Sequence, residues 1–161
     1  MASTGNMKVT TPTDREIVLT RVFDAPRHLV FEAHTKPELL KRWLHGPDGW
    51  LLTVCEIDLK VGGKYRYVWR HTDGREMGMG GSYREIVPPE RVVVTELFDE
   101  DWTGGEVLGT LILSEQDGKT TLTNTLLYPS KDARDGVLKS GMERGVAASY
   151  DRLEGVLASI A

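Results

Sequence analysis

The sequence is poor in cysteine and has no long apolar run. Cys55 is the only cysteine among 161 residues, which excludes an internal disulfide and any metal site built from several thiolates. No stretch approaches the ~20 apolar residues that a membrane-spanning helix needs. The first dozen residues are small and polar, without the apolar core of a signal peptide. A lone thiol without such a segment predicts a cytoplasmic protein that makes no membrane contact.

A basic excess is also missing. The chain has 20 Lys and Arg against 24 Asp and Glu, a net charge of −4, whereas nucleic-acid-binding domains usually carry a basic patch or stripe. We therefore expect no nucleic-acid partner. The four histidines do not fall at a metal-ligand spacing such as H-E-x-x-H, and no dinucleotide fingerprint or nucleophile elbow is present. The sequence predicts no metal and no cofactor.

Length and even composition predict one domain. Residues 1–13 are polar and are expected to form a flexible N-terminal tail. Residues 14–161 contain no linker, internal repeat or low-complexity tract, so we expect them to form a single domain.

Hydrophobic patterning predicts an α+β fold. A strand over 15–24 precedes two short helices, 26–34 and 38–44. Further strands separated by turn signals follow, at 50–59, 64–71, 76–87, 91–98, 106–115 and 120–128. Because they are mostly neighbours in sequence, we expect an antiparallel sheet. Apolar residues every three or four positions predict a helix over 141–160, about 30 Å long and able to cross the sheet.

Alternation along two of these strands gathers aromatic and methionine side chains. If their apolar faces turn toward the last helix, they wall a ligand pocket together with residues of that helix. The candidate ligand-binding residues are Tyr67, Trp69, Met77, Met79, Tyr83, Met142, Val146 and Tyr150. The same residue types also suit a solid core, and periodicity alone does not separate the two.

Two titratable residues are candidates for catalysis. Glu96 lies among apolar neighbours, where an inward-facing carboxyl would have a raised pKa and could act as an acid or a base. His71 continues the Tyr67–Trp69 face to a strand end, where it could act as a general base. The alternative, which we favour for both, is a solvent-facing side chain. The catalytic residues therefore stay undetermined.

Glycines occur at two unusual places. Gly78, Gly80 and Gly81 lie inside one predicted strand and predict a bulge or bend. Gly141 and Gly145 lie four residues apart on the last helix, where each costs about 1 kcal/mol relative to alanine. Close helix–sheet packing or room for a ligand would explain them, and we expect close packing.

Several short motifs occur in an order that is typical of one known family. They are Phe23-Asp24-Ala25-Pro26, Val30-Phe31, Thr35-Lys36-Pro37-Glu38, Trp43, Gly62-Gly63, Gly81-Ser82-Tyr83-Arg84-Glu85-Ile86, Pro88-Pro89-Glu90-Arg91 and Ser140-Gly141-Met142. Together they resemble the SRPBCC superfamily and, within it, the AHSA1-like group, named for its similarity to the activator of Hsp90 ATPase. The chain is also similar to pollen-allergen and START-type lipid-binding domains.

The resemblance implies a helix-grip fold, in which a curved antiparallel sheet wraps around the long C-terminal helix with a cavity between them. Such families mostly bind hydrophobic small molecules, and a minority catalyse reactions such as polyketide cyclisation. Many members have tryptophan where this chain has Leu44 and Val146, and both differences bear on cavity size. The N-terminal signature of true Hsp90 co-chaperones is missing, so we do not expect Hsp90 activation.

Three functions remain open. The first is binding of a hydrophobic small molecule in that cavity. The second is a cyclase- or hydrolase-type enzyme that uses Glu96 or His71 with Tyr67 or Tyr83. The third is an interaction module, in which loops around Trp50 and Trp102 form a homodimer or partner surface.

Overall fold

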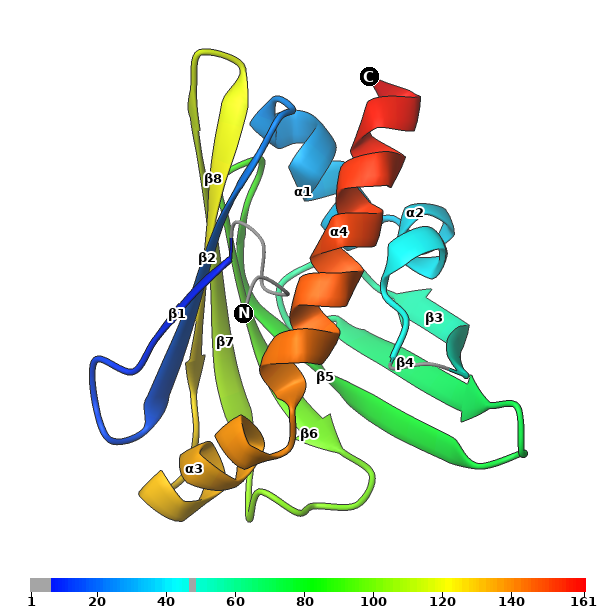
Figure 1. Ribbon diagram of the computed structural model, residues 1–161, viewed down its shortest axis with the longest axis vertical. Helices are drawn as coiled ribbons and strands as arrows, with labels where there is room; N and C mark the ends of the chain where they lie inside the picture. The colour runs from blue at the N-terminus through cyan, green and yellow to red at the C-terminus, as the bar shows by residue number, and fades with distance from the viewer. Residues whose placement is uncertain (1–6, 47–48) are drawn as a thin grey trace.

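An eight-stranded antiparallel sheet forms the body of the protein (Figure 1). The structure is a computed structural model and describes residues 7–46 and 49–161. The strands are β1 (Lys8–Thr10), β2 (Glu16–Phe23), β3 (Trp50–Ile57), β4 (Lys64–His71), β5 (Glu76–Val87), β6 (Arg91–Phe98), β7 (Val107–Gln116) and β8 (Lys119–Leu127). Their order across the sheet is β1-β2-β8-β7-β6-β5-β4-β3, with every neighbouring pair antiparallel.

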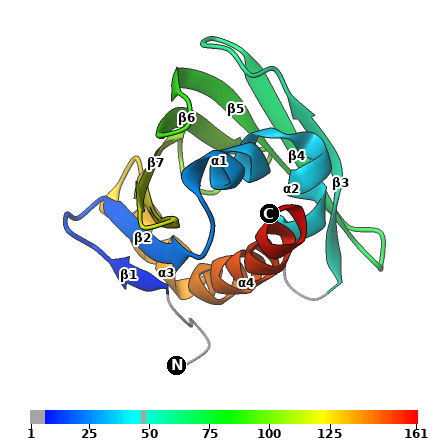
Figure 2. The same cartoon turned by 90° about the horizontal axis from the view of Figure 1, so that it is seen from above.

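The helices lie on the concave side of this sheet. They are α1 (Arg27–Thr35), α2 (Pro37–Trp43), α3 (Lys131–Lys139) and α4 (Met142–Ile160). Seen from above, the sheet bends around α1, and α4 closes the side that the sheet leaves open (Figure 2). This arrangement confirms the α+β class and the helix-grip fold, with two short helices ahead of the main run of strands.

Two elements differ from the sequence-based expectation. Residues 8–10 pair with Val18–Thr20 of β2, so the expected flexible tail over 1–13 is wrong for them, while residues 1–6 lie outside the described residues. Helix α3 was not expected. Its N-cap Ser130 accepts a hydrogen bond from the Ala133 amide at 3.1 Å, and its buried Arg134 donates to the Thr13 carbonyl at 2.7 Å.

Arg21 of β2 fixes the C-terminal half of α4 against the sheet. Its buried guanidinium donates to Asp151 at 2.9 Å and to Glu154 at 3.2 Å, both on α4. The same group lies 5.2 Å from the ring centre of Phe23, and that ring meets the edge of Tyr150 at 5.6 Å. Charge pairing and aromatic packing therefore hold α4 at one side of the concave face.

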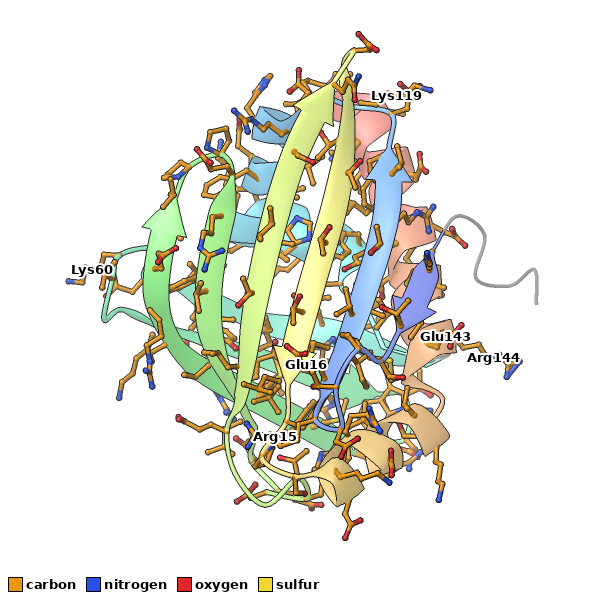
Figure 3. The ribbon with its side chains drawn as sticks, turned by 90° about the vertical axis from the view of Figure 1, so that its left-hand side faces the viewer. Arg15, Glu16, Lys60, Lys119, Glu143 and Arg144 are labelled. Carbon is orange, nitrogen blue, oxygen red and sulfur yellow. The ribbon has the colours of Figure 1, made fainter. Side chains whose placement is uncertain are left out.

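Within the described part of the chain, no helix covers the opposite, convex face of the sheet. Figure 3 shows this face of β2, β8 and β7, with Arg15 and Glu16 near one end of the strands and Lys119 near the other. In this view α1 and α2 lie behind the strands, and α3 lies at the lower end of the strands. The main apolar core therefore lies on the concave side, although β6 also buries Val93 on its other face.

Strand β5 carries the irregularity that its glycines predict. Tyr65 of β4 lies opposite Gly81, and its hydroxyl reaches across β5 to donate to the Thr95 carbonyl of β6 at 2.6 Å. A Cβ atom at Gly81 would collide with that carbonyl oxygen. The pairing register of β5 and β6 then shifts between Tyr83 and Glu85. Glycine is required here because a side chain would push β5 and β6 apart.

The close approach of Gly81 to the Thr95 carbonyl predicts how an added methyl group at position 81 changes stability. Gly81→Ala should lower the free energy of unfolding by about 2 kcal/mol or more, measured by urea denaturation, because a backbone atom must move. Gly155→Ala on α4 is the matched control, since a Cβ there meets no atom within 4 Å. It should stabilise the protein by about 0.5–1 kcal/mol through helix propensity. Equal stabilities for the two variants would contradict the role given to Gly81.

Candidate ligand-binding pocket

A pocket of about 630 Å³ lies between the concave face of the sheet and α4. Strands β4 to β8 supply one wall, the α1–α2 segment supplies one end, and the N-terminal half of α4 lies opposite the sheet. The chain has five tyrosines, and all of them line this pocket: Tyr65, Tyr67, Tyr83, Tyr128 and Tyr150. The fold therefore brings all the phenol groups of the chain into the wall of one pocket.

The structure brings all eight candidate ligand-binding residues into the wall of this pocket. Tyr67 and Trp69 project from β4, and Met77, Met79 and Tyr83 project from β5. Met142, Val146 and Tyr150 face them from α4. Period two along the strands and the helical repeat along α4 explain why residues so far apart in sequence share one surface.

Glu96 also lines the pocket, which corrects the solvent-facing position favoured from the sequence. On β6 it alternates with Val92, Val94 and Phe98, and all four side chains enter the same space. The Glu96 carboxylate lies over Gly109 of β7, where a Cβ atom would approach its oxygen to 2.9 Å. Burial raises the pKa of Glu96 to about 7, because a charged carboxylate loses hydration in this apolar space.

The tyrosines surround this carboxyl as neutral phenols. Burial raises the pKa of all five, and the charge of Glu96 raises it further for Tyr65, Tyr67, Tyr128 and Tyr150. The hydroxyl of Tyr65 already donates to the Thr95 carbonyl, and Asn124, which also lines the pocket, partly offsets the raised pKa of Tyr150. The pocket therefore combines an apolar body with a small set of polar atoms.

Two histidines that the sequence analysis did not single out lie at the α1–α2 end. His34 donates from Nδ1 to the Val30 carbonyl at 2.8 Å, since a carbonyl only accepts, and this leaves Nε2 as an acceptor. Burial lowers the pKa of His34 to about 4. His45 accepts at Nδ1 from the Leu52 amide at 3.2 Å, and burial and the charge of Arg152 lower its pKa. Both rings are neutral at pH 7, and no spacing rule marks either of them.

His71 lies outside the pocket wall. Its ring packs 5.1 Å from the ring of Trp50, and its Nδ1 lies 3.1 Å from both the amide nitrogen and a carboxylate oxygen of Asp73. Of the two forms of the enzyme hypothesis, the one built on His71 loses its place in the cavity, whereas Glu96 lies in the pocket wall together with Tyr67 and Tyr83. Of the two catalytic candidates taken from the sequence, Glu96 is the one that lines the pocket.

Helix α4 turns its glycines toward the open space. Gly141 and Gly145 both line the pocket, and a Cβ atom on either would meet no atom within 4 Å. The close packing expected from the sequence is therefore wrong at both positions. Gly141 has a separate reason to be glycine, since it begins α4 with a φ of 84°. Gly145 has regular helical geometry, so its missing side chain simply enlarges the pocket.

The lining residues that remain exposed mark the mouth of the pocket. They are Met77 of β5, Trp102 of the β6–β7 loop, and Ser140 and Gly141 between α3 and α4. Trp102 packs against Phe98 with ring centres 5.7 Å apart. Trp50, the other tryptophan considered for a partner surface, is half-buried, with the guanidinium of Arg75 5.3 Å from its ring centre.

The described residues offer little metal chemistry. Residues 7–46 and 49–161 hold no group of three His, Cys, Asp or Glu side chains that could bind a metal ion. Cys55 is buried, and burial raises the pKa of its thiol to about 11. In this part of the chain no helix is both long enough and apolar enough to cross a membrane.

Residues 24–158 match the family model described as activator of Hsp90 ATPase homolog 1-like protein. The chain belongs to this family. The match spans α1 to α4 and so includes the helices and strands that enclose the pocket. The fold of this AHSA1-like family is a scaffold for ligand binding.

Solved structures extend the match to almost the whole chain. A crystal structure of a Rhodobacter sphaeroides protein is 34% identical, covers 96% of this chain and 99% of its own, and superposes with a TM-score of 0.90. A solution structure from Staphylococcus epidermidis is 28% identical, with 96% of each chain covered and a TM-score of 0.82. A crystal structure from Chromobacterium violaceum is 27% identical, covers 90% and 98%, and has a TM-score of 0.79. None of the curated proteins matches the chain.

The raised pKa of Glu96 predicts a pH-dependent stability. The folded protein holds this proton up to about pH 7, whereas the unfolded chain releases it near 4.5. The wild type should therefore lose stability relative to Glu96→Gln as pH rises from about 4.5 to 7, by up to about 3 kcal/mol, and the difference should level off above that range.

Urea denaturation at several pH values measures this difference. Glu56→Gln is the matched control, because Glu56 is exposed on β3 and carries the same carboxyl in contact with solvent. This control should change stability by less than about 0.5 kcal/mol. A flat difference between wild type and Glu96→Gln across the range would show that the Glu96 carboxyl is well hydrated.

Proposed function

We propose that this protein binds a hydrophobic small molecule in the pocket between the curved sheet and α4. The observation that carries the proposal is an open volume of about 630 Å³ walled mainly by aromatic and aliphatic side chains. Ligand pockets of this kind commonly measure about 300–1,000 Å³ and combine apolar walls with a few polar groups. The AHSA1-like fold supports the same proposal, since it serves as a ligand-binding scaffold.

Gly145 supports the proposal from the side of the helix. A glycine within regular helix costs about 1 kcal/mol relative to alanine, and no neighbouring atom prevents a larger residue here. An apolar core gains stability when an empty space is filled, so a space kept open at this cost favours a ligand that enters it.

Binding is favoured over the two alternatives. Catalysis would need Glu96 to act with Tyr67 or Tyr83, whose hydroxyl pKa values are raised by burial, and this enzyme alternative stays a prediction. A homodimer built on the loops around Trp50 and Trp102 stays a prediction, as do the cytoplasmic location and the absence of a nucleic-acid partner.

Filling the pocket tests the proposal. Gly145→Trp places an indole in the open space and should weaken binding of neutral apolar compounds, 2-naphthylmethanol among them, by at least about ten-fold in isothermal titration calorimetry. Thermal stability should stay equal to that of the wild type or rise, because the indole fills space and replaces a helical glycine.

Gly155→Trp is the matched control for this experiment. It adds the same indole to the same helix at an exposed position that does not line the pocket, so binding should be unchanged. Equal affinities for Gly145→Trp and wild type would refute the pocket as the binding site. A wild type that binds none of a panel of neutral apolar compounds would refute the proposed function itself.

A further inference from the structure

The pocket wall carries charge of one sign only. Among the described lining residues, Glu96 is the one Asp or Glu, and no Lys or Arg is present. His34 and His45, the other lining groups able to become cationic, are held neutral at pH 7 by burial. An anionic ligand would therefore meet one negative charge and no positive charge inside the pocket.

The surroundings of Glu96 supply no protein counter-ion. Tyr65 and Tyr67 of β4, Tyr83 of β5, Tyr128 after β8 and Tyr150 of α4 are the titratable groups that line the space around it with the two histidines. Gly109 beneath the carboxylate adds no side chain. Two arginines lie near the pocket without lining it: Arg21 pairs with Asp151 and Glu154, and Arg152 donates to the Trp43 carbonyl and the Ser149 hydroxyl.

An unpaired carboxylate in an apolar pocket is energetically costly, and a cation brought by the ligand removes that cost. Aromatic rings add to the attraction, since a cation near the face of a tyrosine or tryptophan ring is stabilised by the electrons of that ring. Tyr67, Trp69 and Phe98 line the pocket together with Glu96. The ion pair and the aromatic wall therefore favour the same class of ligand.

We propose that the pocket selects hydrophobic organic cations, with the Glu96 carboxylate pairing with an ammonium group of the ligand and the aromatic wall enclosing its apolar body. This inference rests on the proposed function, because it assumes that a small molecule enters the pocket. It adds the chemical class of that molecule and names the residue that recognises it.

Three compounds with one skeleton test the preference. 2-Naphthylmethylamine, 2-naphthylmethanol and 2-naphthoate differ only in the group beside the ring, which is cationic, neutral or anionic. Calorimetry at about pH 8, where Glu96 is mostly ionised, should give the amine an affinity at least about ten-fold above that of the alcohol, with the naphthoate weakest.

Glu96→Gln removes the charge while keeping the size of the side chain. In this variant the amine should bind no better than the alcohol, and the naphthoate should bind more tightly than it does to the wild type. Glu56→Gln changes the net charge of the protein by the same amount on the exposed surface and should preserve the wild-type order. Circular dichroism and thermal unfolding check that each variant folds.

The outcomes separate this inference from the proposed function. Binding of the alcohol without a preference for the amine, or a preference that survives in Glu96→Gln, overturns the inference and leaves the proposed function standing. Failure of all three compounds also overturns the inference, and the proposed function then depends on the panel of neutral compounds and on Gly145→Trp.

Discussion

A straight helix can contact only one side of the concave face of a strongly curved sheet. The position of α4, and with it the position of the pocket, depends on this constraint. The contacts of Arg21 determine which side of the concave face α4 occupies. The ion pairs of Arg21 with Asp151 and Glu154 hold the C-terminal half of α4 beside β2, where Leu153 and Leu157 are buried. The backbone of α4 lies closest to α2, α1 and α3, and side chains such as Arg21 bridge the distance between the helix and the strands. The N-terminal half of α4 is therefore left facing the opposite part of the sheet across open space.

The bend in the sheet and the chemistry of the pocket share one cause. Tyr65 reaches over Gly81 to the Thr95 carbonyl, which requires β5 and β6 to approach closely where a side chain would collide. The next residue along β6 is Glu96, and Gly109 on the neighbouring strand leaves room for its carboxylate. Glycines on two strands thus create both the curvature and the space in which a carboxyl can lie inside the domain. A side chain at Gly109 would meet the Glu96 carboxylate, whereas one at Gly81 would meet the Thr95 backbone beside it.

Most of the fold was predictable because its long strands and its last helix repeat their apolar residues regularly. Period two along β4 and β5 also identified five pocket residues, since alternate side chains of a strand share one face. Helix α3 was missed because it buries only Ala133, Arg134 and Val137 among charged neighbours, although its Ser130 cap was a usable signal. Strand β1 was missed because three residues held by pairing with β2 show no periodicity.

Glu96 and the helix glycines show where sequence reasoning fails. On β6 the residues of both faces are largely buried, including Val92 and Val93, so alternation does not reveal which face meets the pocket. A glycine at position 145 is compatible both with close packing and with open space. The sequence pattern is the same in the two cases, so it does not distinguish them. Only the position of α4 relative to the sheet, set by the contacts of Arg21 far along the helix, distinguishes them.

The two differences from the common family pattern, at positions 44 and 146, both concern residues that line the pocket. Leu44 and Val146, where many members are expected to carry tryptophan, both line the pocket, one at the α1–α2 end and the other on α4. Each replaces a large ring by a smaller side chain while leaving Arg21, Phe23 and Tyr150, which position α4, untouched. Leu44 and Val146 are separate from Arg21 and Phe23, so a change in side-chain size at these two positions leaves the contacts of Arg21 with α4 in place. Leu44 and Val146 line the same pocket as Glu96, so size and charge are set by different elements of the same fold.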